Sequence, residues 1–201
     1  MLTLQDLLGQ EKGNEAVEQL SRNLGANQTS VNSAIQMALP VILGGLARNA
    51  SDPQGAQSLN SAIEQDHDGS LLDNLMGYLG GGVSQPQASR QTNGIGILDH
   101  IFGNKQTEIA KEVSQNTDLD MGQVAQLLIT LAPIVMSYLG KQKQEQNLDS
   151  GGLSNWLGGQ RQQIEQSPQG GFLNSILDRD GDGSSMDDLA SMAVNYMKNR
   201  G

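Results

Sequence analysis

An internal repeat restricts the possible folds of this 201-residue chain more than any other feature. Residues 59–75 (LNSAIEQDHDGSLLDNL) align without a gap with residues 173–189 (LNSILDRDGDGSSMDDL). Each copy also carries a proline inside an apolar segment, at Pro40 and at Pro133. Self-similarity of this kind predicts a structural unit that occurs twice.

These matches divide the chain into two units. The first spans residues 1–80, and the second spans residues 97–201 with a Gly- and Gln-rich insert at residues 140–171. Residues 81–96 are rich in Gly, Ser, Gln and Pro, and residues 141–150 are charged and rich in Gln. Because neither stretch offers an apolar face for burial, we expect both to be linkers.

Apolar residues recur at helical spacing within each unit. Residues 31–46 place apolar side chains three and four positions apart, which predicts a core helix that Pro40 should kink or split. Thr3 and Asp6 have the spacing of a helix cap, and Gly25 should end the next helix. The sequence contains no run of alternating β-branched residues, which is the pattern that would predict a sheet. We therefore predict an all-α, multihelical fold from a duplicated unit with helix-loop-helix, Asp-rich loops.

The C-terminal Asp-rich loop resembles the first half of a calcium-binding loop. Aspartates stand at loop positions one, three and five, and Gly183 stands at position six. Hard oxygen ligands at this spacing suit a hard cation such as calcium. The loop departs from the pattern at position twelve, where Leu189 replaces the usual glutamate, so Asp187 or Asp188 has to close a shortened loop. The candidate calcium ligands are Asp178, Asp180, Asp182, Ser184, Asp187 and Asp188.

A simpler interpretation of the same residues stays open. Ser184 can cap the last helix, with Asp187 and Asp188 in its first turn, where the helix dipole favours anions. The first copy of the loop has lost the aspartate at position one, and for it we expect turn and helix-cap chemistry. Its residues at matching positions are Glu64, Asp66, Asp68, Gly69, Ser70 and Asp73.

Composition excludes several classes of function. The chain has no cysteine, and its two histidines, His67 and His100, are far apart in sequence, so zinc sites and a Ser-His-Asp triad are poorly supported. A formal net charge of -10 and 3% aromatic residues disfavour nucleic-acid binding. No phosphate-binding loop, dinucleotide fingerprint or nucleophile elbow occurs.

The apolar segments are too short to indicate a membrane span. Residues 34–47 and 127–139 fall short of the roughly 20 residues that cross a bilayer, and we expect them to be buried core helices. The N-terminal residues do not resemble a secretion signal, so we expect a cytoplasmic protein. Trp156, in a short apolar turn with Leu153 and Leu157, is either a core residue or an anchor for a partner.

With the repeat and the Asp-rich motif, the chain resembles a widespread bacterial family catalogued as a domain of unknown function, family 937. The residues that carry the resemblance are Leu39-Pro40, Ala132-Pro133, Asp66–Ser70 and Asp178–Leu189. The resemblance implies a small all-helical fold without an established activity. Some members have helices arranged in a way similar to helix-turn-helix proteins.

Together these features favour a non-enzymatic helical protein that binds calcium, or is stabilised by it, and contacts another protein. Two alternatives belong to other classes. One is a helical hydrolase that uses loop carboxylates, which requires a pocket holding two carboxylates and an apolar wall. The other is a helix-turn-helix DNA-binding module, which requires a basic face.

Overall fold

The computed structural model describes residues 3–80, 90–166 and 171. Every regular element in these residues is helical, which confirms the predicted all-α class. The elements are α1 (Leu4–Leu8), α2 (Gln10–Leu24), α3 (Gln28–Ala50), α4 (Pro53–Asp66), α5 (Ser70–Asp73), α6 (Leu75–Gly80), the 3₁₀ turn η1 (Arg90–Thr92), α7 (Gly94–Phe102), η2 (Gly103–Lys105), α8 (Gln106–Gln115), α9 (Met121–Gln146) and α10 (Ser150–Glu165).

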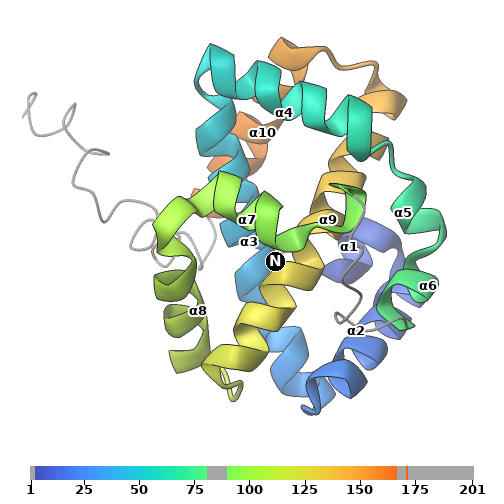
Figure 1. Ribbon diagram of the computed structural model, residues 1–201, viewed down its shortest axis with the longest axis vertical. Helices are drawn as coiled ribbons and strands as arrows, with labels where there is room; N and C mark the ends of the chain where they lie inside the picture. Colours follow the sequence, from blue (N-terminus) through green and yellow to red (C-terminus); the bar gives the residue numbers. More distant parts are fainter. Residues whose placement is uncertain (1–2, 81–89, 167–170, 172–201) are drawn as a thin grey trace, which may run out of the picture.

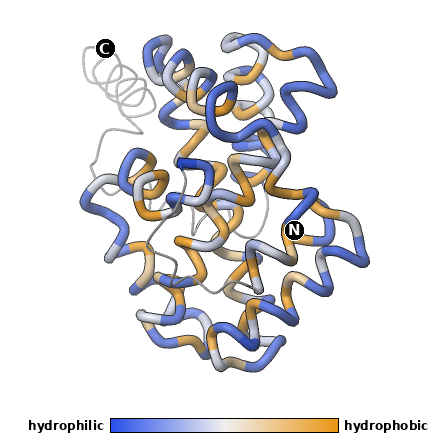
Figure 2. The backbone as a smooth tube through the Cα atoms, turned by 45° about the vertical axis from the view of Figure 1, so that its right-hand side comes forward, coloured by the Kyte–Doolittle hydropathy of each residue, from blue (hydrophilic) through white to orange (hydrophobic). Residues whose placement is uncertain are grey.

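The two longest helices, α3 and α9, form the centre of the fold, and the shorter helices surround them (Figure 1). One hydrophobic core includes residues from both predicted units and from α10. Apolar positions, drawn in orange, concentrate inside the bundle, while polar positions lie outside (Figure 2). Burial of these apolar faces, rather than helix propensity, supplies most of the stability of such short helices.

Several helix ends are those that the sequence predicts. Thr3 and Asp6 form a reciprocal capping box at α1, and Gly25 ends α2 in the left-handed conformation. Residues 31–46 form the buried part of α3, as their spacing predicts. The order of a short helix, a longer helix and a long helix with an internal proline occurs twice, in α1 to α3 and in α7 to α9. The duplication itself stays a prediction.

Both prolines lie inside continuous helices. The expectation that Pro40 could begin a new helix is wrong, because α3 runs unbroken from Gln28 to Ala50. A proline within a helix leaves the carbonyl four residues earlier without its helical partner, and for Pro133 that carbonyl belongs to Ile129. Gly94 packs directly on it, since a Cβ built at Gly94 lies 1.8 Å from Ile129 O. A glycine therefore lets the start of α7 approach α9 at the proline.

The central helices α3 and α9 are long and apolar enough to cross a membrane, judged by length and composition alone. In the fold, however, 78% of the apolar window of α3 and 67% of that of α9 are buried inside the protein. This burial favours the interpretation of residues 34–47 and 127–139 as core helices.

Two predicted linkers are shorter than expected. Helix α7 begins at Gly94, inside the stretch 81–96, and α9 continues to Gln146, inside the stretch 141–150. Lysine, glutamine and glutamate extend a helix readily once it has formed, so a polar composition does not end α9. It ends at Asn147, which adopts the left-handed conformation.

Helix α10 lies within the predicted insert and packs against the core. Leu153 and Leu157 are almost completely buried, and Ser154 Oγ donates a 2.7 Å hydrogen bond to Ala50 O at the end of α3. Trp156 is half-buried, with its ring 6.3 Å from that of Tyr138. The packing interpretation of Trp156 is therefore supported, and the insert contributes to the core.

Candidate functional site

The predicted calcium ligands Asp178, Asp180, Asp182, Ser184, Asp187 and Asp188 all lie outside the described residues. Calcium binding at that loop therefore stays a prediction. Its counterpart in the first unit, residues 64–73, is described and joins α4 to α5. This segment, the N-terminal Asp loop, shows how the chain uses such carboxylates when they lie against the helical core.

Two carboxylates of the N-terminal Asp loop, Glu64 and Asp68, have protein partners. Glu64 Oε1 accepts a 2.7 Å hydrogen bond from Lys143 Nζ, and this contact lowers the pKa of Glu64. Asp68 Oδ1 accepts a 3.0 Å hydrogen bond from Ser70 N, and hydrogen bonding to Ser70 lowers the pKa of Asp68. The bond to Ser70 confirms the predicted turn chemistry, but the predicted helix cap is not formed, because α5 begins after Gly69 without a side-chain cap. No group of three or more metal-ligating side chains forms within the part of the chain that the structure describes.

The end of α9 holds this loop in place. Besides the ion pair of Lys143, Gln144 Nε2 donates a 2.9 Å hydrogen bond to Asp68 O. Gly140 approaches His67 so closely that a Cβ built there lies 1.7 Å from His67 O. Sequence analysis placed these residues in an insert or linker and missed the contact. Their polar side chains indicated exposure, but the side chain of Lys143 is only 16% exposed.

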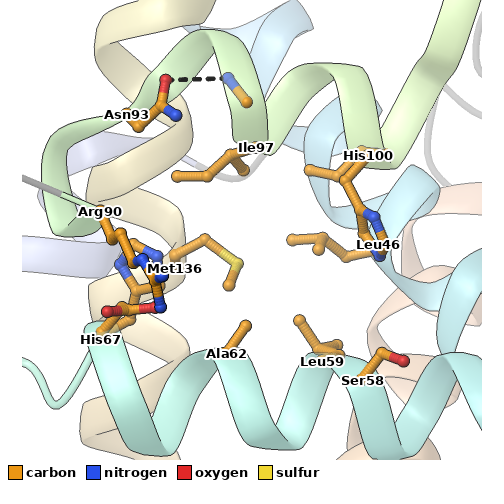
Figure 3. Close-up of a pocket in the computed structure, with 13 residues that line it drawn as sticks. Leu46, Ser58, Leu59, Ala62, His67, Arg90, Asn93, Ile97, His100 and Met136 are labelled. Carbon is orange, nitrogen blue, oxygen red and sulfur yellow. Dashed lines mark hydrogen bonds between the residues drawn. The ribbon is translucent and has the colours of Figure 1, made fainter. Parts of the chain in front are cut away.

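A cavity of about 320 Å³ lies beside the N-terminal Asp loop. Its walls come from α3, α4, α7, α9 and η1, so segments of both predicted units enclose it (Figure 3). The volume is at the lower end of the range for small-molecule sites. Its apolar lining consists of Leu46, Leu59, Ala62, Ile97, Ile101 and Met136, and its polar lining of Ser58, Asp66, His67, Arg90, Asn93 and His100.

Both histidines of the chain line this cavity, although the sequence separates them widely. His67 lies on the same side as Arg90, and His100 lies on the opposite side beside Leu46 (Figure 3). His67 caps the C-terminus of α4 and is 3% exposed, whereas His100 is exposed on α7. Their spacing in the sequence gave no signal, because the two histidines reach one site only when α4 and α7 both pack on α3 and α9.

The surroundings of His67 favour its neutral form. Burial lowers its pKa below the ordinary 6.5, against the opposing effect of Asp66 and Asp68. Its Nδ1 atom is buried and has no hydrogen-bond partner. A neutral imidazole can leave one ring nitrogen unprotonated, which reduces the cost of this missing bond.

Asn93 fixes the start of α7 above the cavity. Its side-chain oxygen accepts a 3.0 Å hydrogen bond from Gly96 N (Figure 3). This cap is local to α7, and the contact between Gly94 and Ile129 O holds the same end of the helix on α9. The cavity is therefore bounded by helices whose positions are set by specific backbone contacts.

Comparison with known families gives one match. A family model described as a bacterial protein of unknown function (DUF937) matches residues 6–142, which is more than half of the chain. No curated protein and no solved structure matches. The matched region contains the N-terminal Asp loop and all the residues that line the cavity, but it ends before Asp178–Leu189. Those residues, which contributed to the resemblance, thus lie outside the family match.

Proposed function

Since the chain belongs to the bacterial family of unknown function DUF937, whose description assigns no activity, we propose that it is a non-enzymatic helical protein with a calcium-binding C-terminal loop and a role in binding another protein. The spacing of Asp178, Asp180 and Asp182 carries this proposal. Three carboxylates at alternate positions before a glycine are typical of oxygen-ligated calcium loops.

The N-terminal Asp loop supports a difference between the two copies. Its Glu64 is paired with Lys143, and its Asp68 accepts a hydrogen bond from Ser70, so an ion there has to displace existing partners. The C-terminal copy has aspartate in place of Glu64 and an additional acid at position 188. Carboxylate number and placement determine calcium affinity, and we therefore assign the ion to the C-terminal loop.

A role in protein binding is supported by the apolar residues on both sides of the C-terminal loop. Phe172, Leu173 and Ile176 precede it, and Leu189, Met192 and Tyr196 follow it, at spacings that place each set on one face of a helix. We infer that calcium orders this helix-loop-helix segment, which then offers its apolar face to a partner protein.

Calcium titration of the full chain tests the proposal. Without a glutamate at position twelve, we expect a dissociation constant on the order of 10⁻⁴ M or weaker by calorimetry. Calcium at ten times that constant should stabilise the protein by about 1.4 kcal/mol, which raises Tm by roughly 3–6 °C. Asp180→Ala should abolish this shift, while the matched variant Asp66→Ala should keep it. An unchanged Tm of the wild type at millimolar calcium contradicts the proposal.

The alternatives have weaker support. The hydrolase alternative needs two carboxylates in one pocket, and the cavity beside the N-terminal Asp loop has a single one, Asp66. The DNA-binding alternative conflicts with a formal net charge of -10, which repels phosphate.

A further inference from the structure

The cavity between α4 and α7 has the features of a ligand site that is independent of calcium. Helix α4 supplies its floor through Leu59 and Ala62, Ile97 of α7 covers it, and the side chain of Met136 points into it (Figure 3). Methionine adapts its shape to what it contacts, so this wall can follow an apolar group of varied form. The apolar lining contributes binding affinity, and the polar lining residues determine which class of ligand binds.

The lining contains one positively charged side chain, Arg90, and one negatively charged side chain, Asp66. Arg90 and His67 lie together on one side of the cavity (Figure 3), and Asp66 is the chain neighbour of His67 and lines the same cavity. His67 is buried, and this burial lowers its pKa and so disfavours a further positive charge there. The lining of the cavity therefore contains one guanidinium and one carboxylate.

We propose that this cavity binds a small zwitterion with an apolar side group, of the class of a free apolar amino acid. Its carboxylate pairs with Arg90, its ammonium group pairs with Asp66, and its side chain fills the space between Leu59, Ala62, Ile97 and Met136. Arginine favours carboxylates because its planar donors match both oxygens.

Other ligand classes fit this lining less well. An apolar carboxylate without an ammonium group brings a second anion towards Asp66, and an apolar amine brings a second cation towards Arg90. Like charges at close range in a partly desolvated site reduce affinity. A zwitterion avoids both costs. It also has no net charge, so the acidic balance of the whole chain does not repel it.

The experiment is isothermal titration calorimetry on the full chain in calcium-free buffer, which separates this site from the C-terminal loop. The probes are L-leucine, 4-methylpentanoate, which lacks the ammonium group, 3-methylbutylamine, which lacks the carboxylate, and glycine, which lacks the apolar group. Leucine should bind saturably, and each of the other probes should bind about tenfold more weakly or worse, since each loses a charged hydrogen bond or the apolar contact.

Substitutions of lining residues test whether leucine binds in this cavity. Arg90→Gln and Asp66→Asn should each weaken leucine binding about tenfold or more, and Ala62→Trp should abolish it by filling the space. The matched controls Arg22→Gln and Asp99→Asn change charged residues outside the lining and should leave binding unchanged. Thermal melts check that every variant is folded, and the two charge-removing changes, Arg90→Gln and Asp66→Asn, remain informative if Ala62→Trp is not.

Three results overturn the proposal. The first is no saturable binding of leucine up to about 10 mM. The second is binding of 4-methylpentanoate or 3-methylbutylamine as tight as that of leucine, which shows that one charge alone is recognised. The third is unchanged leucine affinity in both Arg90→Gln and Asp66→Asn, which places the binding elsewhere.

Discussion

Replacing Gly140 by alanine should force α9 and the N-terminal Asp loop apart. A Cβ built on Gly140 lies 1.7 Å from His67 O and 2.9 Å from His67 C, and both are backbone atoms that cannot rotate away. Carbon atoms in ordinary contact are about 3.5–4.0 Å from their neighbours, so the helix and the loop have to separate by roughly 2 Å. This shift also stretches the hydrogen bond from Gln144 Nε2 to Asp68 O.

The expected loss of stability follows from three effects. Overpacking of this kind costs about 1–3 kcal/mol, and loss of the Gln144 hydrogen bond costs about 0.5–1.5 kcal/mol. The greater helix propensity of alanine offsets about 1 kcal/mol. Gly140→Ala should therefore lower the free energy of unfolding by about 2 kcal/mol, equivalent to a decrease in Tm of roughly 4–8 °C.

Urea denaturation followed by far-ultraviolet circular dichroism measures this change. The matched control is Gly159→Ala in α10, where an added Cβ has no neighbour within 4 Å. The same substitution should raise stability there, by up to about 1 kcal/mol, because it reduces the freedom of the unfolded chain. If Gly140→Ala is as stable as the wild type or more so, the close contact with His67 is not a feature of the native fold.

Two further predictions concern α10 and pH. Leu157 is completely buried, so Leu157→Ala should lower the free energy of unfolding by about 2–5 kcal/mol in urea denaturation, whereas a separable insert predicts almost no change. Burial lowers the pKa of His67 in the folded protein, so the unfolded chain takes up its proton first as the pH falls below about 6.5. Stability should consequently decrease as the pH falls from 7 towards 5, and His67→Gln should reduce the slope of stability against pH; an unchanged slope contradicts the assignment.

Local features of the fold follow from the sequence because their causes are local. The capping box of Thr3 and Asp6 and the glycine that ends α2 depend on residues within one helical turn. The apolar spacing of residues 31–46 depends only on the helical period and predicts the buried face of α3. These elements can therefore be predicted without knowing how the helices are arranged in the fold.

The candidate site depends on tertiary packing, and sequence analysis missed it for that reason. Arg90 and Asp66 line one cavity only because α4 and α7 both pack on α3 and α9, and nothing in the spacing of the two residues predicts this. Polar residues at the end of α9 indicated a linker, since composition alone cannot distinguish a solvated chain from a helix whose polar side chains have distant partners. Lys143 has such a partner in Glu64, 79 residues earlier.

Helix α9 links the cavity to the N-terminal Asp loop, and this leads to a last prediction. Met136, Gly140 and Lys143 are spaced four and three residues apart, which places them on one face of the helix. Along that face, Met136 lines the cavity, Gly140 contacts His67 O, and Lys143 pairs with Glu64. A shift of α9 at Gly140 therefore displaces His67 and, next to it, Asp66.

Because the proposed ammonium contact depends on the position of Asp66, Gly140→Ala should weaken leucine binding as well as stability. The expected loss of affinity is about tenfold, which corresponds to one charged hydrogen bond, and calorimetry well below the Tm of the variant measures it on folded protein. Gly159→Ala should bind leucine as the wild type does, since its added methyl group contacts nothing. Full leucine affinity in a destabilised Gly140→Ala would show that the loop moves without Asp66, and would refute this link between the end of α9 and the cavity.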